Sequence, residues 1–114
     1  MWAVNRSALV VTPKKPFRDW AASIDAEAPK HAAELLNGHF SVYLVPPDPK
    51  EEQESAPLKG FFRVIFEQEL ESWCTDPELW PKRRDLRTFL DWFDARAESL
   101  VWDTVDAPLD TEDW

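Results

Sequence analysis

The alternation of apolar and polar residues predicts two strands in the first half of the chain. Residues 3–12 (AVNRSALVVT) form one, and its second half is apolar on both faces, which is typical of a strand covered on both sides. Residues 40–45 (FSVYLV) are β-branched and aromatic, and Gly38 and Pro46 bound them. Two strands alone are marginal in water, so we expect the sheet to be covered by helices, to gain a third strand, or to be completed by a partner chain.

A period of 3.6 residues predicts helices elsewhere. Phe17, Trp20, Ala21 and Ile24 follow Pro13 and Pro16 with the spacing of one helical face. Residues 30–36 (KHAAELL) predict a short second helix, which Asn37–Gly38 would terminate.

The second half of the chain continues this pattern. Residues 58–73 carry a helical stripe, although FFRVIF at 61–66 also fits a buried strand. Asp85 is a plausible N-cap for a last helix that runs to about Trp102, after a turn at residues 76–81. The pattern therefore predicts an α+β fold in which about four helices, including a long C-terminal one, cover a small two- or three-stranded sheet.

The chain of 114 residues has the length of one domain. We assign residues 1–102 to it. The Pro- and Glu-rich stretch 46–57 predicts an exposed loop, and the acidic residues 103–114 predict a fraying tail. The seven Trp, seven Phe and one Tyr are expected mainly in the core, because burying aromatic rings supplies much of the driving force for folding.

The formal net charge is −9, with 7 Lys/Arg and 14 Asp/Glu in residues 58–114. An acidic surface favours cationic partners and repels phosphate backbones. It also simply keeps a protein soluble.

The sequence contains no motif for several classes of function. Two glycines cannot build a phosphate-binding glycine loop, and Cys74, His31 and His39 have no zinc-ligand spacing. We therefore predict no cofactor, no metal and no enzymatic activity. The single cysteine, the absence of a secretory signal and the short apolar stretches predict a cytoplasmic protein that does not enter the membrane.

Three carboxylates, Asp91, Asp94 and Glu98, recur at i, i+3 and i+7 of the expected last helix. That spacing would align them along one helical face. The face either binds a hard cation or a basic partner, or is simply solvated.

Two basic groups stand out within the acidic chain. Both lie at expected helix starts, where cations oppose the helix dipole, so we expect each group to interact with a compensating negatively charged partner. Internal ion pairs, folding back of the acidic tail, and an external anion or nucleic acid are the alternatives. The first group is Lys14, Lys15 and Arg18, and the second is Lys82, Arg83, Arg84 and Arg87 with Trp80 just upstream.

Three segments, residues 5–20 (NRSALVVTPKKPFRDW), 42–46 (VYLVP) and 70–93 (LESWCTDPELWPKRRDLRTFLDWF), resemble an uncharacterised family of small acidic bacterial proteins. The resemblance implies a bacterial, cytoplasmic origin and carries no activity or cofactor. From the residues we expect a non-enzymatic protein-interaction module whose acidic surface steers a basic partner and whose exposed Trp side chains, such as Trp80 or Trp92, anchor it. Anion or nucleic-acid binding through the two basic groups is the alternative, and an enzyme of unrecognised type is the third.

Overall fold

The computed structural model describes residues 2–24, 38–46 and 56–111. The predicted helix over residues 30–36, nearly all of the expected loop at 46–57, and the last three residues of the tail lie outside the described part of the chain.

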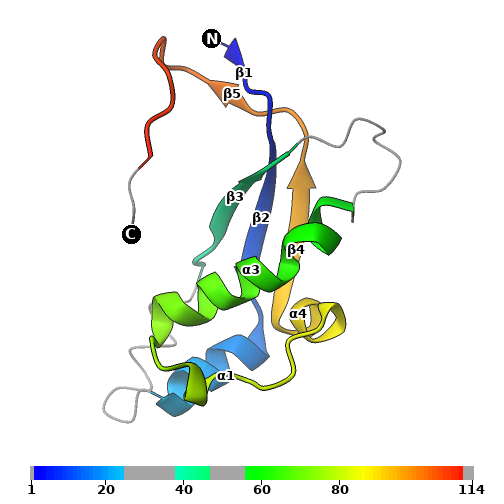
Figure 1. The fold of residues 1–114 in the computed structure, drawn as a ribbon, viewed down its shortest axis with the longest axis vertical. Coiled ribbons are helices and arrows are strands. Elements are labelled where there is room, and N and C mark those ends of the chain that lie inside the picture. The colour runs from blue at the N-terminus through cyan, green and yellow to red at the C-terminus, as the bar shows by residue number, and fades with distance from the viewer. Residues whose placement is uncertain (1, 25–37, 47–55, 112–114) are drawn as a thin grey trace.

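A three-stranded antiparallel sheet of order β3-β2-β4 organises the fold (Figure 1). β2 spans Ser7–Pro13 and lies in the centre, with β3 (Ser41–Val45) on one side and β4 (Phe93–Glu98) on the other. The strands predicted near residues 3–12 and 40–45 are therefore confirmed. β4 is the third strand that makes so small a sheet stable.

The described residues contain three α-helices. α1 spans Lys15–Ile24, α3 spans Ala56–Trp73, α4 spans Leu86–Trp92, and a 3-10 turn lies at Pro77–Leu79. The helical stripe over residues 58–73 is confirmed, and the alternative of a buried strand at 61–66 is wrong. The general α+β class is confirmed as well.

The predicted long C-terminal helix is wrong. α4 begins after its N-cap Asp85, as expected, but ends at Trp92, and β4 follows at once. Residues 93–98 (FDARAE) are ambiguous because Phe93 and Ala97 fit one helical face, while Phe93, Ala95 and Ala97 also fit one strand face. Pairing with the open side of β2 decides for the strand, since tertiary context overrides the helix propensity of Ala, Arg and Glu.

A short second ribbon extends the sheet towards the chain ends. β1 (Trp2–Ala3) pairs with β5 (Trp102–Asp103) in antiparallel register, so the predicted first strand is split in two. Between the pair Ala3–Trp102 of this ribbon and the pair Ala8–Glu98 of the main sheet, the N-terminal segment has one residue more than the C-terminal segment. One extra residue on one of two paired strands is the pattern of a β-bulge. Figure 1 shows the ribbon projecting at the end remote from the helices. Residues 104–111 form no helix or strand and are exposed.

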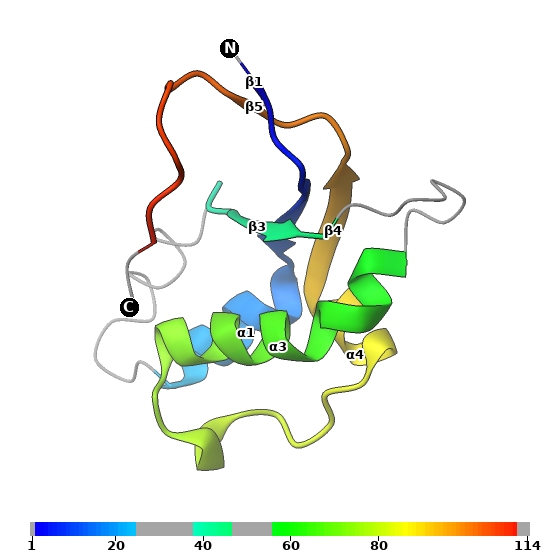
Figure 2. The ribbon, with the colours of Figure 1, turned by 45° about the horizontal axis from the view of Figure 1, so that its top comes forward.

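The core lies between one face of the sheet and the helices, which gather together on that side (Figure 2). Leu9 and Val11 of β2 point into it, as does Phe93 of β4, and all three are at most 1% exposed. Four phenylalanines (Phe17, Phe66, Phe89 and Phe93) pack together in this space, with ring centroids 5.0 Å apart for Phe93 and Phe17 and also for Phe93 and Phe89. We call this side of the sheet the inner face, and the opposite side the outer face.

Candidate functional site

The outer face carries a row of exposed apolar side chains along β3. Val42 is 55% exposed and Leu44 is 50% exposed, and Phe40, directly before the strand, is 55% exposed. Strand residues alternate between faces, so Val42 and Leu44 point away from the helices, while Tyr43 and Val45 pack against the core. We call Phe40, Val42 and Leu44 the β3 row.

The other side of the outer face is charged. Asp94, Arg96 and Glu98 alternate along β4, and Arg96 pairs with Glu98 at 3.0 Å. The expected helical face of Asp91, Asp94 and Glu98 does not exist, because Asp91 lies in α4 and the other two lie in a strand. No group of three or more His, Cys, Asp or Glu that could hold a metal ion occurs among the described residues.

The first predicted basic group contacts the end of α4. The Lys14 ammonium donates to the Leu90 carbonyl at 3.0 Å, in the last turn of α4, where a cation is favourable to the helix dipole. Lys15 pairs with Asp19 one turn along α1 at 2.9 Å. Arg18 is half-buried and makes no ion pair with a described residue.

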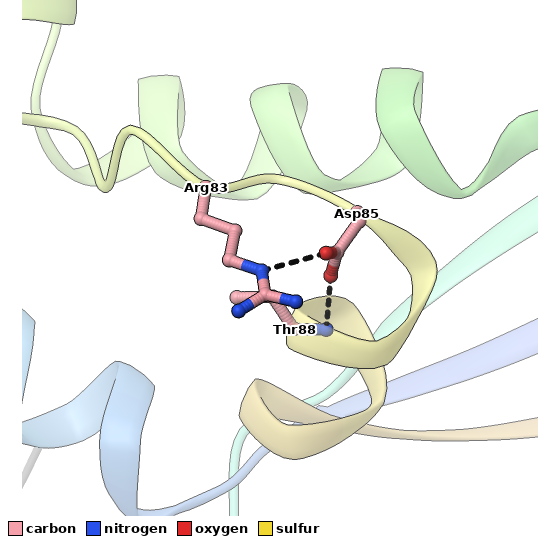
Figure 3. Close-up of polar contacts among 3 residues, drawn as sticks. All are labelled: Arg83, Asp85 and Thr88. Carbon is pink, nitrogen blue, oxygen red and sulfur yellow. Dashed lines mark hydrogen bonds and ion pairs between the residues drawn. The ribbon is translucent and has the colours of Figure 1, made fainter.

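The second basic group precedes α4, and two of its members pair internally. Arg83 donates to the Asp85 carboxylate at 2.7 Å, and the same carboxylate accepts the Thr88 N–H at 2.8 Å as the N-cap of α4 (Figure 3). The hydrogen bonds that the carboxylate accepts hold the pKa of Asp85 well below its usual range. Those from Thr88 have the largest effect, and the one from Arg83 follows. The cation next to the helix start is thus neutralised by the cap itself.

Arg84 forms the more buried contact. Its Nε lies 3.6 Å from the Glu67 carboxylate of α3, its Nη1 donates to the Pro81 carbonyl, and its guanidinium lies 5.9 Å from the Trp80 ring centroid. Lys82 and Arg87 are exposed and make no ion pair with the rest of the described chain.

The two basic groups do not meet. Lys14 contacts the C-terminal end of α4 and Arg83 pairs at its N-terminal end, and the helix of seven residues between these two contacts is about 10 Å long. The described part of the tail forms no ion pair with either group. Of the three alternatives, internal pairing accounts for Lys15, Arg83 and Arg84.

Trp80 and Trp92 are half-buried rather than exposed anchors. The Trp80 indole N–H donates to the Cys74 carbonyl at 2.8 Å, and Trp92 lies against the rings of Phe17 and Phe66. The more exposed indoles are those of Trp2 and Trp102 on the β1–β5 ribbon, at 51% and 52%.

One buried carboxyl was not anticipated. Glu69 of α3 is 5% exposed, and its Oε1 makes no hydrogen bond. Burial raises the pKa of Glu69. Hydrogen bonds from the Ser41 and Tyr43 hydroxyls and the nearby His39 lower it, but the effect of burial is larger. Burial and the same carboxyl raise the pKa of Tyr43, which therefore stays a donor. The sequence held a signal for this group, because Glu69 falls on the apolar stripe of its helix, four residues after Ile65 and four before Trp73.

Comparison with known proteins places the chain in no family: no family model, no curated protein and no solved structure matches it. Within the described residues, no helix has the length and apolarity needed to cross a membrane.

Proposed function

We propose that this chain is a non-enzymatic, cytoplasmic protein-interaction module that binds its partner through the outer face of the sheet. The observation that carries the proposal is the β3 row. All three described α-helices cover the inner face, which leaves Val42 and Leu44 at least half exposed on the other face, with the exposed Phe40 directly before the strand. Contiguous exposed apolar groups rimmed by polar ones are typical of interaction sites.

The charge pattern supports the same proposal. The rim on β4 is charged, and the chain as a whole carries −9, so a basic partner would be steered towards the surface before the apolar contacts form. Anion or nucleic-acid binding receives less support, because the two basic groups lie at opposite ends of α4 and three of their members already contact carboxylates.

A photo-crosslinking pair tests this proposal. A photoreactive amino acid is placed at Val42 or, as a matched control, at Val64, a valine that is 66% exposed on α3. We expect one saturable adduct from position 42 in cells of the native host and none from position 64. Adducts of equal yield from both positions, or none from either, would contradict a binding site on the outer face.

A further inference from the structure

We propose that the partner binds as an extended, cationic segment that adds, as a fourth strand, to the edge of β3 at which no other described strand pairs. The inference rests on the proposed function and deepens it, since it states both the mode of binding and the chemistry of the partner. Strand addition draws affinity from backbone hydrogen bonds and specificity from alternate side chains.

The backbone register shows which groups of β3 are available. Lys14 and Trp92 continue the β2–β4 register by one pair, and the Lys14 N–H donates to the Trp92 carbonyl at 2.8 Å. Hydrogen-bonded and non-hydrogen-bonded pairs alternate in an antiparallel ladder, so the even-numbered residues of β2 bond to β4 and the odd-numbered ones to β3. The Phe93 N–H is consistent with this alternation, because it donates to the Phe89 carbonyl of α4 and not to β2.

It follows that Ser41, Tyr43 and Val45 bond to the odd residues of β2. The N–H and C=O groups of Val42 and Leu44 then point away from β2, towards the edge where no other described strand pairs. Each of these two residues therefore offers both backbone hydrogen-bonding groups at the edge and an exposed apolar side chain on the outer face.

The two edges of the sheet differ in their protection. β4 carries the charged residues Asp94, Arg96 and Glu98, which are the kind of side chains that discourage an edge strand from pairing with another chain. β3 (SVYLV) contains no charge, proline or glycine, and its exposed side chains are apolar. Only β3 is therefore suited to accept a further strand.

Charge selects the incoming strand. Residues 25–55, the stretch that contains β3, hold seven Asp/Glu and two Lys, and the chain carries −9 in total. A second copy of this chain would carry the same net charge of −9 and would be repelled, whereas a segment with Lys or Arg between apolar residues would be attracted.

Peptide binding to the full chain tests the mode of binding. The probe is a labelled nine-residue peptide of alternating Lys and Val, with a Glu–Val peptide as the charge control and two N-methylated forms, one at every Val amide and one at every Lys amide. We expect the Lys–Val peptide to bind at least about tenfold more tightly than the Glu–Val peptide, which corresponds to about 1.4 kcal/mol. One methylated form should lose binding and the other should keep it. If the peptide adds antiparallel to β3, the form methylated at the Val amides should lose binding, because valines opposite Val42 and Leu44 would direct their N–H groups to β3.

Two variants of the protein complete the test. Leu44→Pro removes one outward N–H while keeping the bonds of its neighbours to β2, and Leu44→Thr keeps that N–H with a similar loss of apolar surface. We expect at least about tenfold weaker binding for Leu44→Pro than for Leu44→Thr, with unchanged circular dichroism for both.

Equal affinity of the two methylated peptides would overturn strand addition. If the crosslinker at Val42 still captured one protein, the proposed function would stand and only this inference would fail. If the chain self-associates and Leu44→Pro abolishes this self-association, the segment that binds this edge belongs to a second copy of the chain, and the proposal of a cationic partner is wrong.

Discussion

The buried carboxyl of Glu69 gives the sharpest stability prediction. Replacing it by glutamine keeps its size and its capacity to accept hydrogen bonds from Ser41 and Tyr43, and removes the ionisation. The matched control is Glu71→Gln, two residues further along the same helix, where the side chain is exposed.

The expected magnitude follows from the burial of the carboxyl. Glu69 is 5% exposed and its Oε1 makes no hydrogen bond, and leaving such a buried polar atom unpaired costs about 1–3 kcal/mol, more when it is charged. Glutamine still buries an unpaired polar atom at this place, but a neutral one, so the gain is the extra cost of the charge; we expect Glu69→Gln to be more stable than the parent by at least about 1 kcal/mol at pH 8.

The sign with pH follows from the raised pKa of Glu69. Below its ordinary value of 4.5 the carboxyl is protonated in both the folded and the unfolded chain, so the variant and the parent have similar stability. As the pH rises, the unfolded chain ionises first, and the parent loses stability until the pH has passed the pKa of the folded state. The difference between variant and parent is thus absent near pH 4 and grows above it.

Urea unfolding followed by tryptophan fluorescence measures this difference at each pH, because four Trp side chains (Trp20, Trp73, Trp80 and Trp92) pack against the core. The control Glu71→Gln should follow the parent at every pH. Parallel stability profiles for Glu69→Gln and the parent, or a variant that is less stable at pH 8, would refute the reasoning, since either would mean that the ionised carboxylate is well solvated or paired.

Three further predictions concern the fold. Phe93→Ala should destabilise the chain by about 3–5 kcal/mol in urea unfolding, because it empties the centre of the phenylalanine cluster, and Phe61→Ala on the exposed side of α3 should cost much less. Asp85→Ala should make the stability of the chain fall less steeply than that of the parent as the pH drops below 3.8, because the lowered pKa of this N-cap makes its ionised form stabilising; an acid titration by circular dichroism checks this. Ala95→Asp should cost at least about 1 kcal/mol, because Ala95 faces the core from β4, while Asp94→Ala on the outer face should be nearly neutral; equal effects of the two would contradict the strand.

Local patterns gave most of the elements but not their arrangement. The apolar stripes placed α1 and α3, the cap Asp85 placed the start of α4, and the β-branched run at 41–45 placed β3. The end of α4 was missed because the alternation in FDARAE is compatible with both periods, and only the unpaired side of β2 selects the strand.

The candidate surface depended still more on the fold. The strand at residues 40–45 is visible in the sequence, but its edge position is not, because a strand paired on both sides would show the same β-branched pattern. The basic groups illustrate the opposite case. Their charges stand out in the sequence, yet Lys14 finds its partner, the Leu90 carbonyl, seventy-six residues away, which no local pattern indicates.

The sequence by itself determined the α+β class, the aromatic core and the acidic composition, because composition and short-range periodicity are properties of the chain alone. The tertiary structure alone decided that residues 93–98 pair as a strand, that Glu69 is buried beneath β3, and that the backbone of Val42 and Leu44 faces an edge where no other described strand pairs. These features depend on contacts between distant segments, and the free energy of those contacts outweighs the small local preferences that a sequence pattern records.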